Sequence, residues 1–267
     1  MPEFQWWLVY LVMGLGVGVF AGMLGIGGGT ILVTLMVLAF NAQEFAPDRV
    51  LHLALGSALG TIIFTSISSF YAHDKHGAVR WDIVRVGAPG MMAGTLLGSF
   101  VAEHLSSKYL ALLFVAFVFY SGIQMIFEMR AAPSRQLPGR VGLSVAGLLV
   151  GILSSLVGAG GGVITIPLLT KCNVPLRQAI GTSAAFGLPI ALTGAAGYVI
   201  NGFSKDHLPA FSLGYVYLPA VAAIVVGTFM TVPMGARLAH RMPVVVLKRI
   251  FGIVLWLLGV KMLWPFI

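Results

Sequence analysis

The sequence predicts an all-α, polytopic integral membrane protein made of two inverted repeats of about five segments each, with glycine-broken half-helices. Its 267 residues are 58% hydrophobic and 9% charged, with a mean hydropathy of +0.98. Because about a quarter of the residues of a soluble domain are charged, this composition excludes a soluble enzyme, a disordered chain and a secreted disulfide scaffold. The apolar runs are long and continuous, which favours helices over the alternating strands of a membrane barrel.

Ten apolar segments follow one another along the chain, and we expect about eight of them to span or nearly span a membrane. A spanning helix needs about 20 residues. The segments lie at 6–24, 29–40, 50–72, 83–102, 108–127, 141–157, 162–171, 178–200, 213–236 and 245–264. Two of them, 29–40 and 162–171, are too short to cross at about 1.5 Å per residue, so we expect half-helices there.

The most polar stretch of the chain, 128–140, contains two prolines and separates the segments into two sets of five. Prolines and polar residues between apolar segments are typical of a connecting loop. We therefore expect a first transmembrane repeat at 1–130, a connecting cytoplasmic loop at 131–138 and a second transmembrane repeat at 139–267.

Two short motifs recur in the same order in both sets. The stretch 22–33, Gly-Met-Leu-Gly-Ile-Gly-Gly-Gly-Thr-Ile-Leu-Val, resembles 155–166, Ser-Leu-Val-Gly-Ala-Gly-Gly-Gly-Val-Ile-Thr-Ile, which lies 133 residues later. Ala-Leu-Gly-Ser at 54–57 corresponds to Ala-Ile-Gly-Thr at 179–182. We interpret the two ordered matches as an internal repeat.

The basic residues are divided unequally between two groups of loops. Twelve of the 16 Lys and Arg residues fall in one group, and the other four are Arg49, Lys108, Lys205 and Lys261. Cytoplasmic loops are rich in Lys and Arg, which places both termini on the outer side and gives each half an odd number of crossings. The halves are then inverted relative to each other, as in many secondary transporters. The N-terminus has no basic n-region, so we expect no cleaved signal peptide.

Each short segment begins at the end of a triple glycine, which is unfavourable inside a helix. Within a bilayer, such unwound backbone is tolerated where it is buried in protein or lines a cavity. A half-helix that begins there directs free N–H groups and a partial positive charge at the break, so two inverted copies predict one central site for a small anion. Close helix packing is the alternative explanation for the glycines. The candidate substrate-binding residues at the breaks are Gly27, Gly28, Gly29, Thr30, Gly160, Gly161, Gly162 and Val163.

Hydroxyl side chains near the repeated Gly-Ser and Gly-Thr turns complete the predicted site. The candidates are Ser57 and Thr61, which share one helix face, and Thr182 and Ser183 in the second half. Every Asp, Glu, Lys and Arg falls near a segment end, so we expect amide groups, helix ends and hydroxyls to hold the anion without a fixed countercharge. Hydrogen bonding of these hydroxyls within their own helices is the alternative.

The sequence gives no support for other chemistry. His73 and His76 lie three residues apart without further ligands, which indicates an ordinary loop and no metal site. No serine-hydrolase or zinc-protease motif is present, and the single Cys172 cannot form an intrachain disulfide. Basic residues spread over many loops do not form a nucleic-acid surface. We therefore expect no enzyme activity, no metal, no cofactor and no nucleic-acid partner.

Several motifs of the chain occur together in one known pattern. Two of them are the glycine motifs described above. The other two are Thr-Ser-Ile-Ser-Ser-Phe-Tyr-Ala-His at 65–73 and Ala-Ile-Gly-Thr-Ser-Ala at 179–184. With these residues, the chain resembles the sulfite exporter TauE/SafE family of bacterial membrane permeases over about 8–264. The resemblance implies transport of sulfite, sulfonates and other small organosulfur anions across the bacterial inner membrane.

These observations together predict a permease that moves a small sulfur-containing anion across the inner (plasma) membrane by alternating access. An anion channel without alternating gates and a membrane enzyme or non-transporting scaffold are the alternatives. The expected partners are the lipid bilayer and a small anionic substrate. The sequence leaves open whether a proton or sodium is the coupling ion, and whether the protein is a monomer or a homodimer.

Overall fold

The computed structural model describes residues 3–24, 28–127, 136–206, 208–239 and 244–263, which form ten helices and one two-stranded hairpin. Each predicted segment coincides with a helix, and the all-α fold class is confirmed. Most of the predicted loop at 131–138 lies outside the described residues. The helices are α1 (Phe4–Leu24), α2 (Gly29–Ala42), α3 (Val50–Asp74), α4 (Trp81–His104), α5 (Ser107–Ile126), α6 (Arg140–Val157), α7 (Gly162–Lys171), α8 (Leu176–Gly202), α9 (Leu218–Ala239) and α10 (Val244–Leu263).

The helix expected at 213–236 begins five residues later than predicted, at Leu218. The structure has an antiparallel hairpin there, formed by β1 (Ser212–Leu213) and β2 (Val216–Tyr217), before α9 begins. Gly214 at the turn has a φ of +54°, a left-handed conformation that glycine adopts without strain. Pro219 is the second residue of α9, in the first turn of the helix, where the missing N–H of proline would have no partner in any case. The prediction was wrong at this boundary because hydropathy alone does not separate a short apolar strand from a helix.

Glycines allow α4 and α6 to pack with their backbones in direct contact. Gly90, Gly94 and Gly98 follow one another at four-residue spacing along α4. A Cβ on Gly94 would collide with the carbonyl oxygen of Leu148 in α6. Membrane helices associate through such close packing because lipid supplies no hydrophobic force between them.

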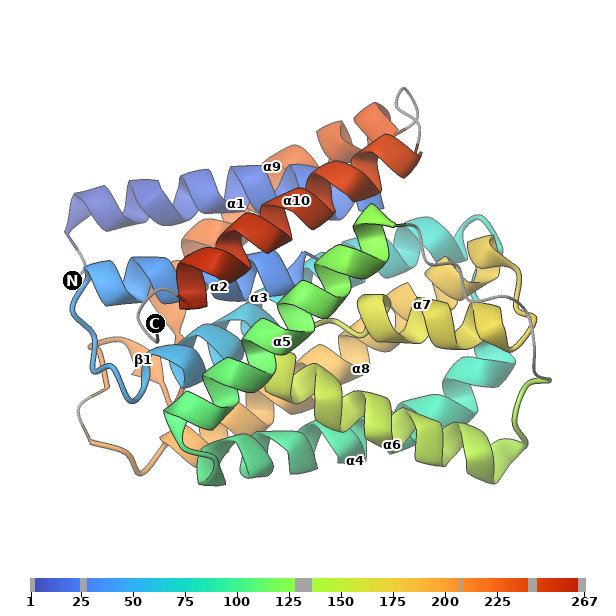
Figure 1. Ribbon diagram of the computed structural model, residues 1–267, viewed down its shortest axis with the longest axis horizontal. Coiled ribbons are helices and arrows are strands. Elements are labelled where there is room, and N and C mark those ends of the chain that lie inside the picture. Colours follow the sequence, from blue (N-terminus) through green and yellow to red (C-terminus); the bar gives the residue numbers. More distant parts are fainter. Residues whose placement is uncertain (1–2, 25–27, 128–135, 207, 240–243, 264–267) are drawn as a thin grey trace.

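Contacts of the same kind join other helices of the two sets. A Cβ on Gly14 in α1 would collide with the backbone of Ile224 in α9, and α5 meets α10 at Gly122 and Gly252. Each of these pairs, like α4 with α6, joins a helix from the first set of five to a helix from the second. The two halves of the sequence are therefore interleaved in space (Figure 1).

The helices α3 and α8 form the centre of the bundle. Leu59 packs against Gly194 and Ser66 against Gly187, so the two helices run in opposite directions. Most of α3 is buried, whereas α1, α6 and α10 expose many large apolar side chains. Among the described residues, six helices are long and apolar enough to cross a membrane, which together with the exposed apolar surface identifies a multi-pass membrane protein. The start of α1 and the end of α10 lie at the same end of the molecule (Figure 1).

Candidate substrate site

The two half-helices enter the bundle from opposite ends. The helix α2 lies in the half of the molecule where α1 begins, and α7 lies in the other half (Figure 1). Each half-helix begins after a glycine with left-handed backbone, since φ is +60° at Gly28 and +82° at Gly161. A side chain makes this conformation costly, which explains why glycine stands at both breaks. Gly27, also predicted for the site, lies outside the described residues.

The two breaks meet in the interior of the bundle. A Cβ on Gly29 would collide with the carbonyl oxygen of Gly158 and would lie 3.5 Å from the Cα atom of Ala159. The side chain of Ile62 in α3 touches both breaks, because it lies 2.8 Å from the Cβ position of Gly29 and 3.2 Å from that of Gly160. The structure therefore brings residues of the two predicted glycine motifs together at one buried point.

Backbone donors are concentrated at this point. The first N–H groups of a helix have no acceptor in their own helix and carry a partial positive charge. The N-cap residues of α2 and α7 are Gly28 and Gly161, which have no side chain that could accept a hydrogen bond from these N–H groups. Thr30, Gly162 and Val163 belong to the first turns of α2 and α7 and are buried. Two neighbouring helix N-termini without capping side chains are suited to binding an anion.

Three of the four predicted hydroxyls have partners within the protein. Thr61 Oγ1 donates to the carbonyl oxygen of Ser57 at 3.0 Å. Ser57 Oγ accepts the N–H of Tyr217 at 2.8 Å, and Thr182 Oγ1 accepts the N–H of Arg80 at 3.0 Å. The helix-internal hydrogen bond that we considered for these hydroxyls is thus present only at Thr61.

Buried hydroxyls without a partner lie in the helices on either side of the second break and in α8. Within the described part of the chain, these are the hydroxyls of Ser154 and Ser155 at the end of α6, of Thr165 in α7 and of Ser183 in α8. Thr165 is 1% exposed, and its Oγ1 lies 3.4 Å from the Cβ position of Gly161. Because buried polar groups are normally paired, these atoms are candidate ligand donors. Of these four residues, only Ser183 was predicted for the site, although polar residues inside an apolar run near a break were a usable signal.

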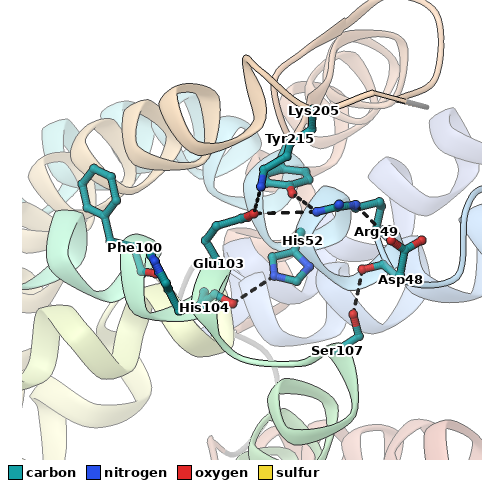
Figure 2. A network of polar contacts seen from close by, with 10 residues as sticks. Asp48, Arg49, His52, Phe100, Glu103, His104, Ser107, Lys205 and Tyr215 are labelled. Atoms are coloured by element: carbon teal, nitrogen blue, oxygen red, sulfur yellow. Dashed lines mark hydrogen bonds and ion pairs between the residues drawn. The ribbon is translucent and has the colours of Figure 1, made fainter.

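A charged cluster joins the start of α3 to the end of α4 (Figure 2). Its residues were not predicted from the sequence. Lys205 Nζ lies 2.6 Å from Glu103 Oε1, and Arg49 Nη1 lies 3.7 Å from the same oxygen. Arg49 also donates to the phenol oxygen of Tyr215 at 2.6 Å. Burial raises the pKa of this phenol to about 12, so it stays neutral. His52, 3% exposed, lies beside the ring of Tyr215.

We expect Glu103→Gln to lower the melting temperature Tm by about 3–6 °C in detergent. The change leaves the cations of Lys205 and Arg49 without their carboxylate, which costs about 3–5 kcal/mol at a fully buried site. Partial exposure of both cations reduces this to about 1–2 kcal/mol, and each kcal/mol shifts Tm by about 2–4 °C at this size. Thermal unfolding measures the shift, and the exposed Glu44→Gln is the control. Equal Tm values for the two variants would contradict a stabilising cluster.

Comparison with known proteins adds to this geometry. The family model described as sulfite exporter TauE/SafE matches residues 10–262. A probable membrane transporter protein of Haemophilus influenzae is 31% identical over 261 residues, which cover 97% of this chain and 98% of the relative. The probable membrane transporter proteins YdhB of Bacillus subtilis and MJ0441 of Methanocaldococcus jannaschii are 28% and 24% identical, over 90% and 98% of this chain and 93% and 98% of their own lengths. No solved structure shows a significant match. Since the family model covers nearly the whole chain, the protein belongs to the sulfite exporter TauE/SafE family of membrane transporters.

Proposed function

We propose that the protein is a permease of the bacterial inner membrane that moves a small sulfur-containing anion, of the sulfite or sulfonate class, by alternating access. The observation that carries this proposal is the meeting of the two glycine breaks, where Gly29 packs on Gly158 inside the bundle. The family description, sulfite exporter, supports the choice of anion.

The donors around the breaks suit a small oxyanion. Helix N-termini bind sulfate- and phosphate-like groups through their N–H groups, and the hydroxyls of Thr165 and Ser183 add buried donors. The closest charged residues along α3 are Asp74 at its end and Arg49 at its N-cap, which are 12 and 13 residues, or about 18 and 20 Å, from Ile62 at the breaks. An anion held without a fixed countercharge can be selected by geometry and still be released.

We also propose that the two sets of five helices are inverted repeats. In support, the first helix of each set packs on the fourth helix of the other, α1 on α9 and α6 on α4. The third helices, α3 and α8, pack against each other in opposite directions. With the loops rich in Lys and Arg in the cytoplasm, both termini lie on the outer side. Imposing a proton or a sodium gradient in the transport assay tests whether either ion is coupled to transport.

Proteoliposomes test the proposed function. We expect uptake of labelled sulfite or a small sulfonate that is accelerated by unlabelled substrate on the opposite side. Gly161→Leu, which puts a side chain at a φ of +82° and 2.8 Å from Ile190 Cδ1, should abolish the flux. Unitary currents without this counterflow would identify a channel, and full flux in Gly161→Leu would show that the site lies elsewhere.

We expect Thr165→Val and Ser183→Ala to raise the KM for the anion about tenfold or more, because a hydrogen bond to a charged group contributes about 1.5–3 kcal/mol. Their Tm values should stay equal or rise, since each change removes a buried hydroxyl that has no partner among the described residues. Initial uptake rates and thermal unfolding measure the two effects. The control is Thr193→Val, whose hydroxyl donates to the carbonyl oxygen of Pro189 at 2.7 Å, and whose KM should not change. An unchanged KM in the first two variants would exclude these hydroxyls as ligands.

A further inference from the structure

Two backbone segments are hydrogen-bonded to the repeated Gly-Ser and Gly-Thr pairs, which the structure places inside the helices α3 and α8 and not in the turns expected from the sequence. In the β1–β2 hairpin, the N–H of Tyr217 donates to Ser57 Oγ at 2.8 Å. At the end of the loop 75–80, the N–H of Arg80 donates to Thr182 Oγ1 at 3.0 Å. Each segment comes directly before the fourth helix of its set, α9 or α4. The two contacts are therefore equivalent under the proposed repeat.

Glycines let both segments lie directly against a central helix. A Cβ on Gly56 would collide with the carbonyl oxygen of Tyr215, and a Cβ on Gly181 would collide with that of Ala78. Tyr215 and Ala78 each stand two residues before the N–H donor of their segment. The same close approach, followed by the same hydrogen bond, thus occurs twice at matching positions.

Each of the two contacts lies between the glycine breaks and an end of the bundle, and the two ends are different. Ser57 is seven residues beyond the start of α3, or about 10 Å, and Thr182 is six residues beyond the start of α8, or about 9 Å. Five residues further along each helix are Ile62, which touches both breaks, and Gly187, which packs against the second break. Because α3 and α8 run in opposite directions, the hairpin lies on one side of the breaks and the loop 75–80 on the other.

An open cavity of about 710 Å³ lies at the hairpin. Tyr217 and Phe45 line this cavity. The ring of Tyr217 packs edge-on against Tyr10, Phe40 and Phe45. Tyr217 therefore contacts the cavity and an aromatic cluster through its side chain and Ser57 through its backbone N–H.

Side chains hold each segment from the surface side as well. Arg49 donates to the phenol of Tyr215 at the hairpin (Figure 2). At the loop, Arg80 donates from Nε to Asp82 Oδ1 at 2.8 Å and from Nη2 to Asp82 Oδ2 at 2.6 Å. The Arg49 contact ties the hairpin to the start of α3, whereas the Arg80–Asp82 pair fixes the junction between the loop and α4.

We propose that the β1–β2 hairpin and the loop 75–80 are the two gates of the carrier, and that Ser57 and Thr182 are positioning residues that hold these gates closed. In this role the two hydroxyls do not bind the anion, which revises their predicted place in the substrate site. Both gates are closed in the structure, and breaking one of the two hydrogen bonds opens the breaks to one side only. The inference rests on the proposed function, because a gate needs a transported substrate.

Labelling of a cysteine at the breaks from each side of the membrane tests the proposal. Cys172, the single cysteine of the chain, is replaced by alanine, and Ile62→Cys supplies the reporter. A charged methanethiosulfonate that does not cross the bilayer is added to right-side-out and inside-out vesicles. We expect Ser57→Ala to raise the labelling rate about fivefold from the hairpin end, and Thr182→Val to raise it about fivefold from the opposite end, since each removes one buried hydrogen bond.

Matched controls remove a hydroxyl that bonds only within its own helix. Ser121 in α5 and Thr193 in α8 each donate to a carbonyl oxygen one turn earlier. We expect Ser121→Ala and Thr193→Val to leave labelling unchanged from both ends. Thr182→Ser keeps the acceptor oxygen and should label at the rate of the parent.

The two gate variants must shift labelling to opposite ends. Increases from the same end, equal increases from both ends, or rates equal to the controls would overturn the proposal. If Ser57→Ala yields no folded protein, Tyr215→Phe takes its place, because it removes the phenol that Arg49 binds on the same hairpin. Labelling needs no substrate, so the expected labelling without oxyanion transport would refute the proposed function alone. Normal transport with unchanged labelling would refute the gates alone.

Discussion

Replacing Gly29 with alanine is expected to reduce the initial rate of anion uptake about tenfold and to lower Tm by several degrees. The new methyl group would collide with the carbonyl oxygen of Gly158, a backbone atom that cannot rotate away, so the two breaks must separate. Alanine by itself favours a helix over glycine by about 1 kcal/mol, but forcing atoms into a packed interior costs about 1–3 kcal/mol or more. The collision therefore determines the sign of the effect.

The same substitution at Gly16 is the control. Gly16 lies in α1, and a Cβ there would meet nothing within 4 Å, so Gly16→Ala should transport normally and melt at the same or a higher temperature. Gly160→Ala is an intermediate case, because its nearest neighbour, at 3.2 Å, is a side-chain atom of Ile62 and not a backbone atom. If Gly29→Ala transported as well as Gly16→Ala, contact between the breaks would not be needed for function.

The features that depend on local sequence could be predicted. Continuous apolar runs located every helix, and the two short runs became the half-helices α2 and α7. The triple glycines placed both breaks, because left-handed backbone at Gly28 and Gly161 requires residues without a Cβ. Duplication of the motif also predicted that the breaks would meet, and in the structure Gly29 packs on Gly158.

The features that depend on distant pairing could not be predicted. Arg49, Glu103 and Lys205 each looked like an ordinary residue at a segment end, and nothing in their spacing shows that they meet. The partners of Ser57 and Thr182 are backbone N–H groups, which leave no trace in the side-chain pattern. Hydropathy reports which residues avoid water, but in a membrane it does not report which helix a given face will contact.

Cutting the chain in the connecting loop gives the second large expected effect. Expressed alone, neither the fragment 1–130 nor the fragment 139–267 should yield folded protein, whereas the two expressed together should assemble and transport. In each fragment alone, the glycine faces of the first, fourth and fifth helices lack their partners, since α1 packs on α9, α4 on α6 and α5 on α10. Yield after size-exclusion chromatography, together with uptake by the co-expressed pair, measures both parts of the prediction.

The proposed inverted arrangement makes this test sharper than a test of stability. A fragment that pairs with a second copy of itself could in principle replace the missing half, because the halves share their motifs. All copies of one fragment insert in the orientation set by the same Lys and Arg residues, however, whereas α1 needs a partner from a half of the opposite orientation. Self-assembly of 1–130 into a transporting homodimer would therefore contradict the inverted topology, and a monodisperse, stable single fragment would show that the halves are independent domains.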